Sequence, residues 1–382
     1  MALAIVFIIL FGSAAAVPAV WSIVKLIRGN WNAWPCVAGT VFALVLLGIT
    51  VGGIVSNWGG CPVSGGTSDG SVQCYQNVHG EWQKQCEPDV WRVQCRQPLP
   101  RSGQANVPIP IGSFCPPGQQ WVAVFPFCEP IQLGGVKQPW ATWSDLSFVA
   151  AGLWLLWFFQ FFGTSKRLFA NPGDNPMSSI NVLSVAYCFI VLFMGPPSMW
   201  YHASMKQWGG WFDTMSVIAW LAFNAVYVIY ALVASMWGRG RSFWRTVVVL
   251  GGWCFIVALF GIIAGINKDA HLYLYFASGV PWGIAEVIYV FRAAFASNVQ
   301  YRRTWFLFGI NLVLLAATMT LWMFFNDGLM KEECVGRSGF PGHAIFHIMA
   351  SFSTMLTFFS FASERSTAVL NDINIFSPFR NA

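Results

Sequence analysis

Five residues in the second half of the chain have side chains suited to metal-assisted hydrolysis. They are Ser198, His202, Asp213, His343 and His347, and each lies at the end of a long apolar segment. His343 and His347 are four residues apart, which on a helix places both imidazoles on one face, and Ser198 and His202 share that spacing. Three neutral imidazoles can bind Zn²⁺ and leave a fourth position for water. Asp213 is then the candidate proton acceptor and donor, and Ser198 the candidate hydrogen-bond donor to an oxyanion.

Each feature also has a simpler explanation. A His-x-x-x-His pair at a helix start is often interfacial, Ser198 is typical of a cap, and Asp213 suits the positive end of a helix. The joint pattern is more specific, because the chain has only 5 histidines and three of them share this arrangement.

The composition indicates a polytopic membrane protein. Of the 382 residues, 56% are hydrophobic and 9% are charged, whereas soluble domains average about a quarter charged. The net charge of +6 does not predict nucleic-acid binding, because the basic residues are scattered between apolar runs and there set topology.

Nine apolar segments are long enough to cross a bilayer. They are approximately Ala2–Val24, Val37–Val55, Ser144–Phe162, Ser178–Pro196, Asp213–Trp237, Thr246–Ile266, His271–Phe291, Trp305–Phe325 and Gly342–Phe361. The expected fold is therefore all-α. We expect four parts: a transmembrane hairpin (1–55), a Cys-rich loop module (56–138), a seven-span domain (139–362) and a tail (363–382).

The basic residues predict the orientation. Most Lys and Arg residues fall on one side of the nine spans, which should be cytosolic by the positive-inside rule. The N-terminus and the Cys-rich loop are then extracytosolic and the C-terminus cytosolic.

Six of the 10 cysteines lie in that loop and Cys334 lies in another loop of the same side, which indicates a disulfide framework of unknown pairing with one odd thiol.

The arrangement resembles the CREST superfamily of seven-span membrane proteins, and most closely its alkaline ceramidase branch. The resemblance rests on Ser-x-x-x-His, an Asp eleven residues later, and a late His-x-x-x-His on the last of seven spans. The segments 138–148 (QPWATWSDLSF) and 195–204 (GPPSMWYHAS) are similar to that branch as well. The resemblance covers about residues 127–361 and leaves the first 125 residues outside it.

The resemblance implies zinc on His202, His343 and His347, with Asp213 and Ser198 beside the metal-bound water. Ceramidase members hydrolyse the amide of ceramide, and a disulfide from Cys128 to Cys334 would match one of their features. They can also carry Ca²⁺ before the first core helix. Here Glu129 is the only nearby carboxylate that could serve, because Gln138 replaces the family's acidic residue and Asp145 stands where Asn is usual.

Three functions remain open at this point. The first is a zinc-dependent lipid amidase whose two-tailed substrate enters sideways from the membrane. The second is a signalling protein of the progestin/adiponectin receptor type, and the third is a structural subunit that retains a metal and binds a protein partner through residues 1–138.

Glu286 and His271 are further polar residues in or beside spans. We expect Glu286 to bond a neighbouring helix, or to act as a proton relay or substrate contact, and His271 to be interfacial.

Overall fold

The computed structural model describes the helical part of the chain and several short strands. The described residues are 2–55, 77–78, 81–82, 93–96, 120–123, 136, 138–162, 175–178, 180–204, 207–237, 243–267, 270–295, 301–302, 305–325 and 342–366. The Cys-rich module lies almost entirely outside them, so its predicted disulfides, and the pair Cys128 and Cys334, stay predictions. Among the described residues, Cys36, Cys188 and Cys254 are free thiols.

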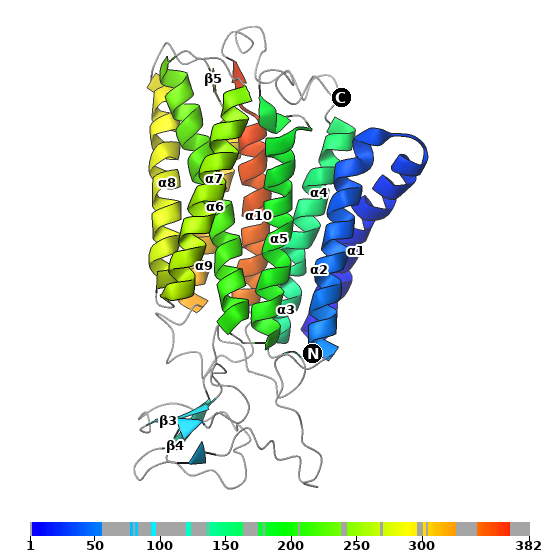
Figure 1. Ribbon diagram of the computed structural model, residues 1–382, viewed down its shortest axis with the longest axis vertical. Helices are drawn as coiled ribbons and strands as arrows, with labels where there is room; N and C mark the ends of the chain where they lie inside the picture. The colour runs from blue at the N-terminus through cyan, green and yellow to red at the C-terminus, as the bar shows by residue number, and fades with distance from the viewer. Residues whose placement is uncertain are drawn as a thin grey trace.

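Long helices run side by side to form the body of the protein (Figure 1). In chain order they are α1 (Ala2–Ile27), α2 (Trp34–Val55), α4 (Leu146–Phe162), α5 (Val182–Ser204), α6 (Gln207–Trp237), α7 (Phe243–Ile266), α8 (His271–Phe295), α9 (Trp305–Phe325) and α10 (Gly342–Ala362). The short helix α3 (Pro139–Ser144) precedes α4, and 3-10 turns occupy Trp31–Ala33 and Pro176–Ser178.

Three two-stranded antiparallel sheets accompany the helices within the described residues. They pair β1 (Asn77–Val78) with β2 (Glu81–Trp82), β3 (Val93–Arg96) with β4 (Gln120–Ala123), and β5 (Tyr301–Arg302) with β6 (Arg365–Ser366). The last pair joins the segment before α9 to the end of α10, with Tyr301 opposite Ser366.

Eight helices of the described residues are long and apolar enough to span a membrane. The protein is therefore an all-α multi-pass membrane protein, as its composition predicts. Nine spans were predicted, and the predicted third one corresponds to α4, which has 17 residues, directly follows α3 and is not among these eight helices. Its neighbours along the bundle are α1, α2, α5 and α10.

Two helix boundaries differ from expectation in a way that affects the site. The fourth span was expected to end at Pro196, but α5 continues through Pro196 and Pro197 to Ser204. Likewise α6 begins at Gln207, so Asp213 lies in its second turn and does not open the helix. A proline removes one backbone donor and bends a helix without necessarily ending it where neighbouring helices support the chain.

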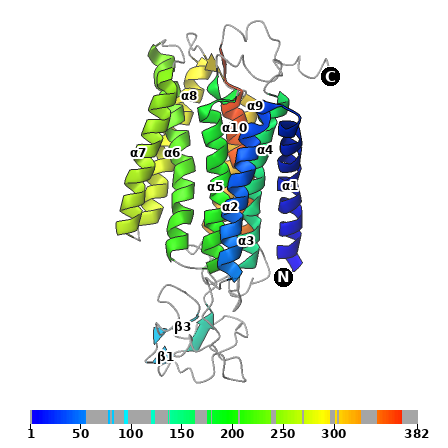
Figure 2. The same ribbon diagram turned by 45° about the vertical axis from the view of Figure 1, so that its right-hand side comes forward.

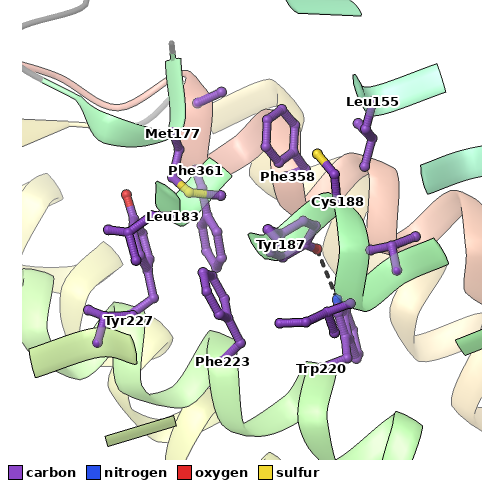
Figure 3. Packing of buried hydrophobic residues seen from close by; sticks show 14 of the residues in the cluster. Leu155, Met177, Leu183, Tyr187, Cys188, Trp220, Phe223, Tyr227, Phe358 and Phe361 are labelled. Atoms are coloured by element: carbon purple, nitrogen blue, oxygen red, sulfur yellow. Dashed lines mark hydrogen bonds between the residues drawn. The ribbon is translucent and has the colours of Figure 1, made fainter. Parts of the chain in front are cut away.

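The main core lies between α5, α6 and α10. Figure 3 shows the Tyr187 hydroxyl accepting a hydrogen bond of 2.9 Å from the Trp220 indole, with Phe358 and Phe361 packed nearby. The same hydroxyl donates to the Thr354 carbonyl oxygen at 2.7 Å. The Tyr187 hydroxyl and the Trp220 indole thus both have a partner, which ties α5 to α6 and α10.

Candidate metal centre

Two helices bring the three predicted imidazoles together. His202 lies in the last turn of α5, and His343 and His347 lie in the first two turns of α10. These three residues are 1%, 4% and 3% exposed. One ligand atom from each lies within 4.8 Å of the others, so the buried cluster could hold a metal ion.

One contact within the cluster has the dimension expected between two metal ligands. His343 Nε2 and His202 Nε2 are 3.3 Å apart. Two nitrogens bonded tetrahedrally to one zinc at about 2.0–2.1 Å stand about 3.3 Å from each other. The same distance also allows a long hydrogen bond between the two rings. The geometry therefore fits one shared cation.

The outer nitrogen of His202 is held by Gln138. The Gln138 side-chain oxygen lies 2.7 Å from His202 Nδ1, and the Gln138 backbone N–H donates to the His202 carbonyl oxygen at 3.0 Å. An amide oxygen only accepts, so this contact assigns the proton to Nδ1 and leaves the lone pair on Nε2. That lone pair is on the nitrogen that faces His343, as metal binding requires.

The outer nitrogen of His347 is held by the segment that links α3 to α4. His347 Nδ1 lies 2.9 Å from Asp145 Oδ1 and 2.9 Å from Ser144 Oγ. The Ser144 hydroxyl donates to the Ala141 carbonyl oxygen at 2.8 Å, so its oxygen is free to accept from the ring. A buried carboxylate behind an imidazole orients the ring and increases its basicity toward a metal on the other nitrogen.

Ser198 and Asp213 border the cluster from α5 and α6. Ser198 is buried one turn before His202, and Asp213 is partly buried. The carboxylates of Asp145 and Asp213 both lie close enough to His347 to interact with its ring electrostatically. The structure thus places all five residues singled out in the sequence in one region.

Glycines allow the helices to approach closely enough to build this region. A Cβ on Gly195 would stand 2.8 Å from the Asp145 carbonyl oxygen and 2.8 Å from Val149 Cγ2. A Cβ on Gly209 would stand 2.9 Å from the Tyr201 Cα. The first glycine lets α5 reach the α3–α4 link, and the second lets α6 start beside the end of α5, which positions Asp213.

A second polar group lies beside Asp213 on α6 and α8. Thr214 Oγ1 is 3.2 Å from His271 Nδ1 and accepts a hydrogen bond of 3.2 Å from the Tyr275 hydroxyl. His271, expected to be interfacial, is therefore hydrogen-bonded to α6. It is not part of the three-histidine cluster. Glu286 is partly buried on α8, and its role stays a prediction.

Gln138 and Asp145 are the site residues whose role the sequence did not predict. Both are fully buried. In the sequence they were considered only for a calcium site, and the structure instead puts each of them against a histidine ring. The available signal was a polar residue, Gln138, and an ionisable one, Asp145, at the start of an apolar span, where each is costly unless it has a partner. Glu129, the remaining calcium candidate, lies outside the described residues.

In comparisons with known proteins, no family model and no curated sequence matches the chain.

Proposed function

We propose that the protein is a zinc-dependent membrane hydrolase that cleaves the amide bond of a ceramide-like lipid. The observation that carries this proposal is the buried convergence of His202, His343 and His347, with a hydroxyl and a carboxylate beside it. The resemblance to the ceramidase branch of the CREST superfamily supports the same conclusion, with α4 to α10 as the seven core helices.

The donor set fits zinc. Nitrogen ligands suit this ion, and two of the three rings have an outer partner that leaves the inner nitrogen free to bind. When bound, zinc would polarise a carbonyl group and make a water molecule more acidic. His202, His343 and His347 would hold the ion, while Gln138 and Asp145 fix the ring orientations.

The remaining residues supply proton transfer and oxyanion stabilisation. Asp213 accepts a proton from the attacking water and later delivers it to the leaving amine as the carbon–nitrogen bond breaks. Ser198 donates a hydrogen bond to the oxygen that becomes negative during the attack. The products are a fatty acid and a lipid amine, and Asp213 is returned to its starting state.

The position of the site suits a lipid amide. His202 lies at the end of one candidate span, and His343 and His347 lie at the start of another. Helix ends sit near the boundary between hydrocarbon and headgroups, which is also where the amide of a ceramide lies. A substrate could thus reach the site without leaving the bilayer.

The proposed orientation places the site on the extracytosolic side. The α1–α2 turn and β5 lie at the end of the bundle opposite α3 (Figure 1). That end carries Lys25, in the last turn of α1, and the paired residues Arg302 and Arg365. A basic end is typical of the cytosolic side, which supports the orientation inferred from the sequence.

The test is metal analysis combined with hydrolysis of labelled ceramides by the purified full-length protein. We expect one zinc per chain and release of fatty acid. An Asp213→Asn variant should keep the zinc and lose about 10²–10⁴-fold in turnover, because only proton transfer is removed. Zinc without hydrolysis of any lipid amide would instead favour the structural subunit or the signalling protein.

A further inference from the structure

The N-terminal hairpin (α1 and α2) lies outside the resemblance and takes no part in the proposed chemistry. Its packing nevertheless connects it to the site. α1 contacts α3 and α4, and α2 contacts α4 and α5. Figure 2 shows α2 beside α5, the helix that carries Ser198 and His202.

The inner face of α1 packs directly behind the site. Phe7 and Phe11 form a buried cluster with Leu146, Met199 and Ala344. These last three residues follow Asp145, Ser198 and His343 in the sequence. One small apolar cluster thus contacts the neighbours of three site residues, which come from the α3–α4 link, α5 and α10.

The second helix of the hairpin holds α5 through a hydrogen bond. The Trp200 indole donates to Thr50 Oγ1 at 2.7 Å, and the Thr50 hydroxyl donates to the Leu46 carbonyl oxygen at 2.9 Å. Trp200 lies between Ser198 and His202 on α5, and Thr50 is fully buried. An indole N–H without a partner is costly in an apolar environment, so this bond favours one position of the α5 end.

A third contact anchors α1 on α4. Pro18 lies inside α1 and lacks an N–H, so the helical partner of the Ala14 carbonyl is missing. The Trp154 indole of α4 donates to that carbonyl oxygen at 2.8 Å. The proline therefore creates an acceptor that α4 uses, and the hairpin is fixed to the bundle by specific bonds as well as by apolar packing.

We propose that the hairpin is a positioning element of the metal site, acting through Phe7, Phe11 and Thr50. It holds the α3–α4 link, the end of α5 and the start of α10 at the separation at which three imidazole nitrogens bind one ion. This inference rests on the metal binding of the proposed function, but it does not depend on the substrate or on hydrolysis.

The first experiment measures metal release from the full-length protein loaded with Co²⁺, using a chelator and the visible spectrum of the bound ion. The variant Phe7→Ala/Phe11→Ala should release cobalt at least about tenfold faster than the unmodified protein, the size of effect seen when the partners of metal ligands are removed. The matched control is Ile9→Ala/Leu10→Ala on the outer face of α1, where the side chains are 63% and 56% exposed. It should release cobalt at the unmodified rate.

The second experiment separates positioning from general stability. Thr50→Val removes the acceptor for Trp200 at nearly constant volume, whereas Thr50→Ser keeps the hydroxyl. We expect Thr50→Val to alter the cobalt spectrum and to speed the release of cobalt. Thr50→Ser should keep both the spectrum and the release rate of the unmodified protein. Thermal unfolding of the metal-free forms reports the change in general stability separately.

The outcomes distinguish this inference from the proposed function. Cobalt spectra and release rates that are identical in all hairpin variants would overturn the positioning role and leave the hydrolase untouched. A protein that binds the ion and depends on the hairpin, yet cleaves no amide, would overturn only the proposed activity. A protein that binds no metal would overturn both.

Discussion

The two ends of α10 carry buried polar groups that are satisfied in different ways. At the C-terminal end of α10, called the far end below because the histidines lie at the other, Asn175 Nδ2 lies 2.8, 3.1 and 3.1 Å from the carbonyl oxygens of Phe361, Ala362 and Glu364. Its Oδ1 accepts from the Met177 N–H at 2.9 Å. The last carbonyls of a helix have no partner within it, so this side chain completes the hydrogen bonding of the backbone.

At the other end, the polar side chains are directed at each other. His343 and His202 face each other through ring nitrogens, while Gln138 and Asp145 hold the outer nitrogens of His202 and His347. No backbone group requires this convergence. The comparison shows that burial of polar groups alone does not mark a functional site; what marks it is several acceptor atoms directed at one point.

The largest expected effect comes from removing a proposed ligand. A His347→Ala variant should lose bound zinc completely, because two imidazoles and a solvent molecule cannot hold the ion buried at this position. Metal content by mass spectrometry, with Asn175→Ala at the far end as the control, measures this. Equal zinc content in the two variants would contradict the proposal that only the histidine end of α10 binds the ion.

A smaller effect is expected from the carboxylate behind His347. Asp145→Ala should weaken zinc binding by about 10–100-fold, since the outer partner of a ligating histidine orients the ring. Asp145→Asn keeps an oxygen that can accept from Nδ1, so its loss should be smaller. Competition with a chelator of known affinity gives both values. A stronger defect in Asp145→Asn than in Asp145→Ala would contradict the orienting role.

The far end should respond in stability and not in metal binding. Asn175→Ala leaves α10 carbonyl oxygens without their partner, at a cost of roughly 1–3 kcal/mol in the free energy of unfolding. Thermal unfolding in detergent should show the loss, while zinc content stays at that of the unmodified protein. Loss of zinc in this variant would mean that the two ends are coupled along α10.

The smallest effect is expected at Tyr227, also at the far end. Its hydroxyl lies 3.4 Å from Glu364 Oε2, which is long for a hydrogen bond, and its ring stacks on Phe361 at 4.6 Å between centroids. Tyr227→Phe keeps the ring contact, so unfolding should change by about 0.5 kcal/mol or less. A larger loss would show that the Glu364 carboxylate depends on this hydroxyl.

The sequence predicted the membrane helices and the metal-site residues for different physical reasons. Apolar length alone identifies a span, since a helix must cover the hydrocarbon with residues that need no partner. Rare ionisable residues at the ends of such spans then stand out, and His202, Asp213, His343 and His347 were found in this way. The predicted zinc and calcium ions and the disulfides remain predictions.

Gln138 and Asp145 show what only the tertiary structure decided. Each is an isolated polar residue, and nothing near it in the sequence indicates which ring it contacts, because His202 is 64 residues from Gln138 and His347 is 202 residues from Asp145. The same holds for Phe7, Phe11 and Thr50, which in the sequence belong to an ordinary apolar hairpin. The sequence determined which residue types face the membrane and which can do chemistry. Helix packing decided which of them meet, because close approach depends on small residues such as Gly195 and on the paths of several helices together.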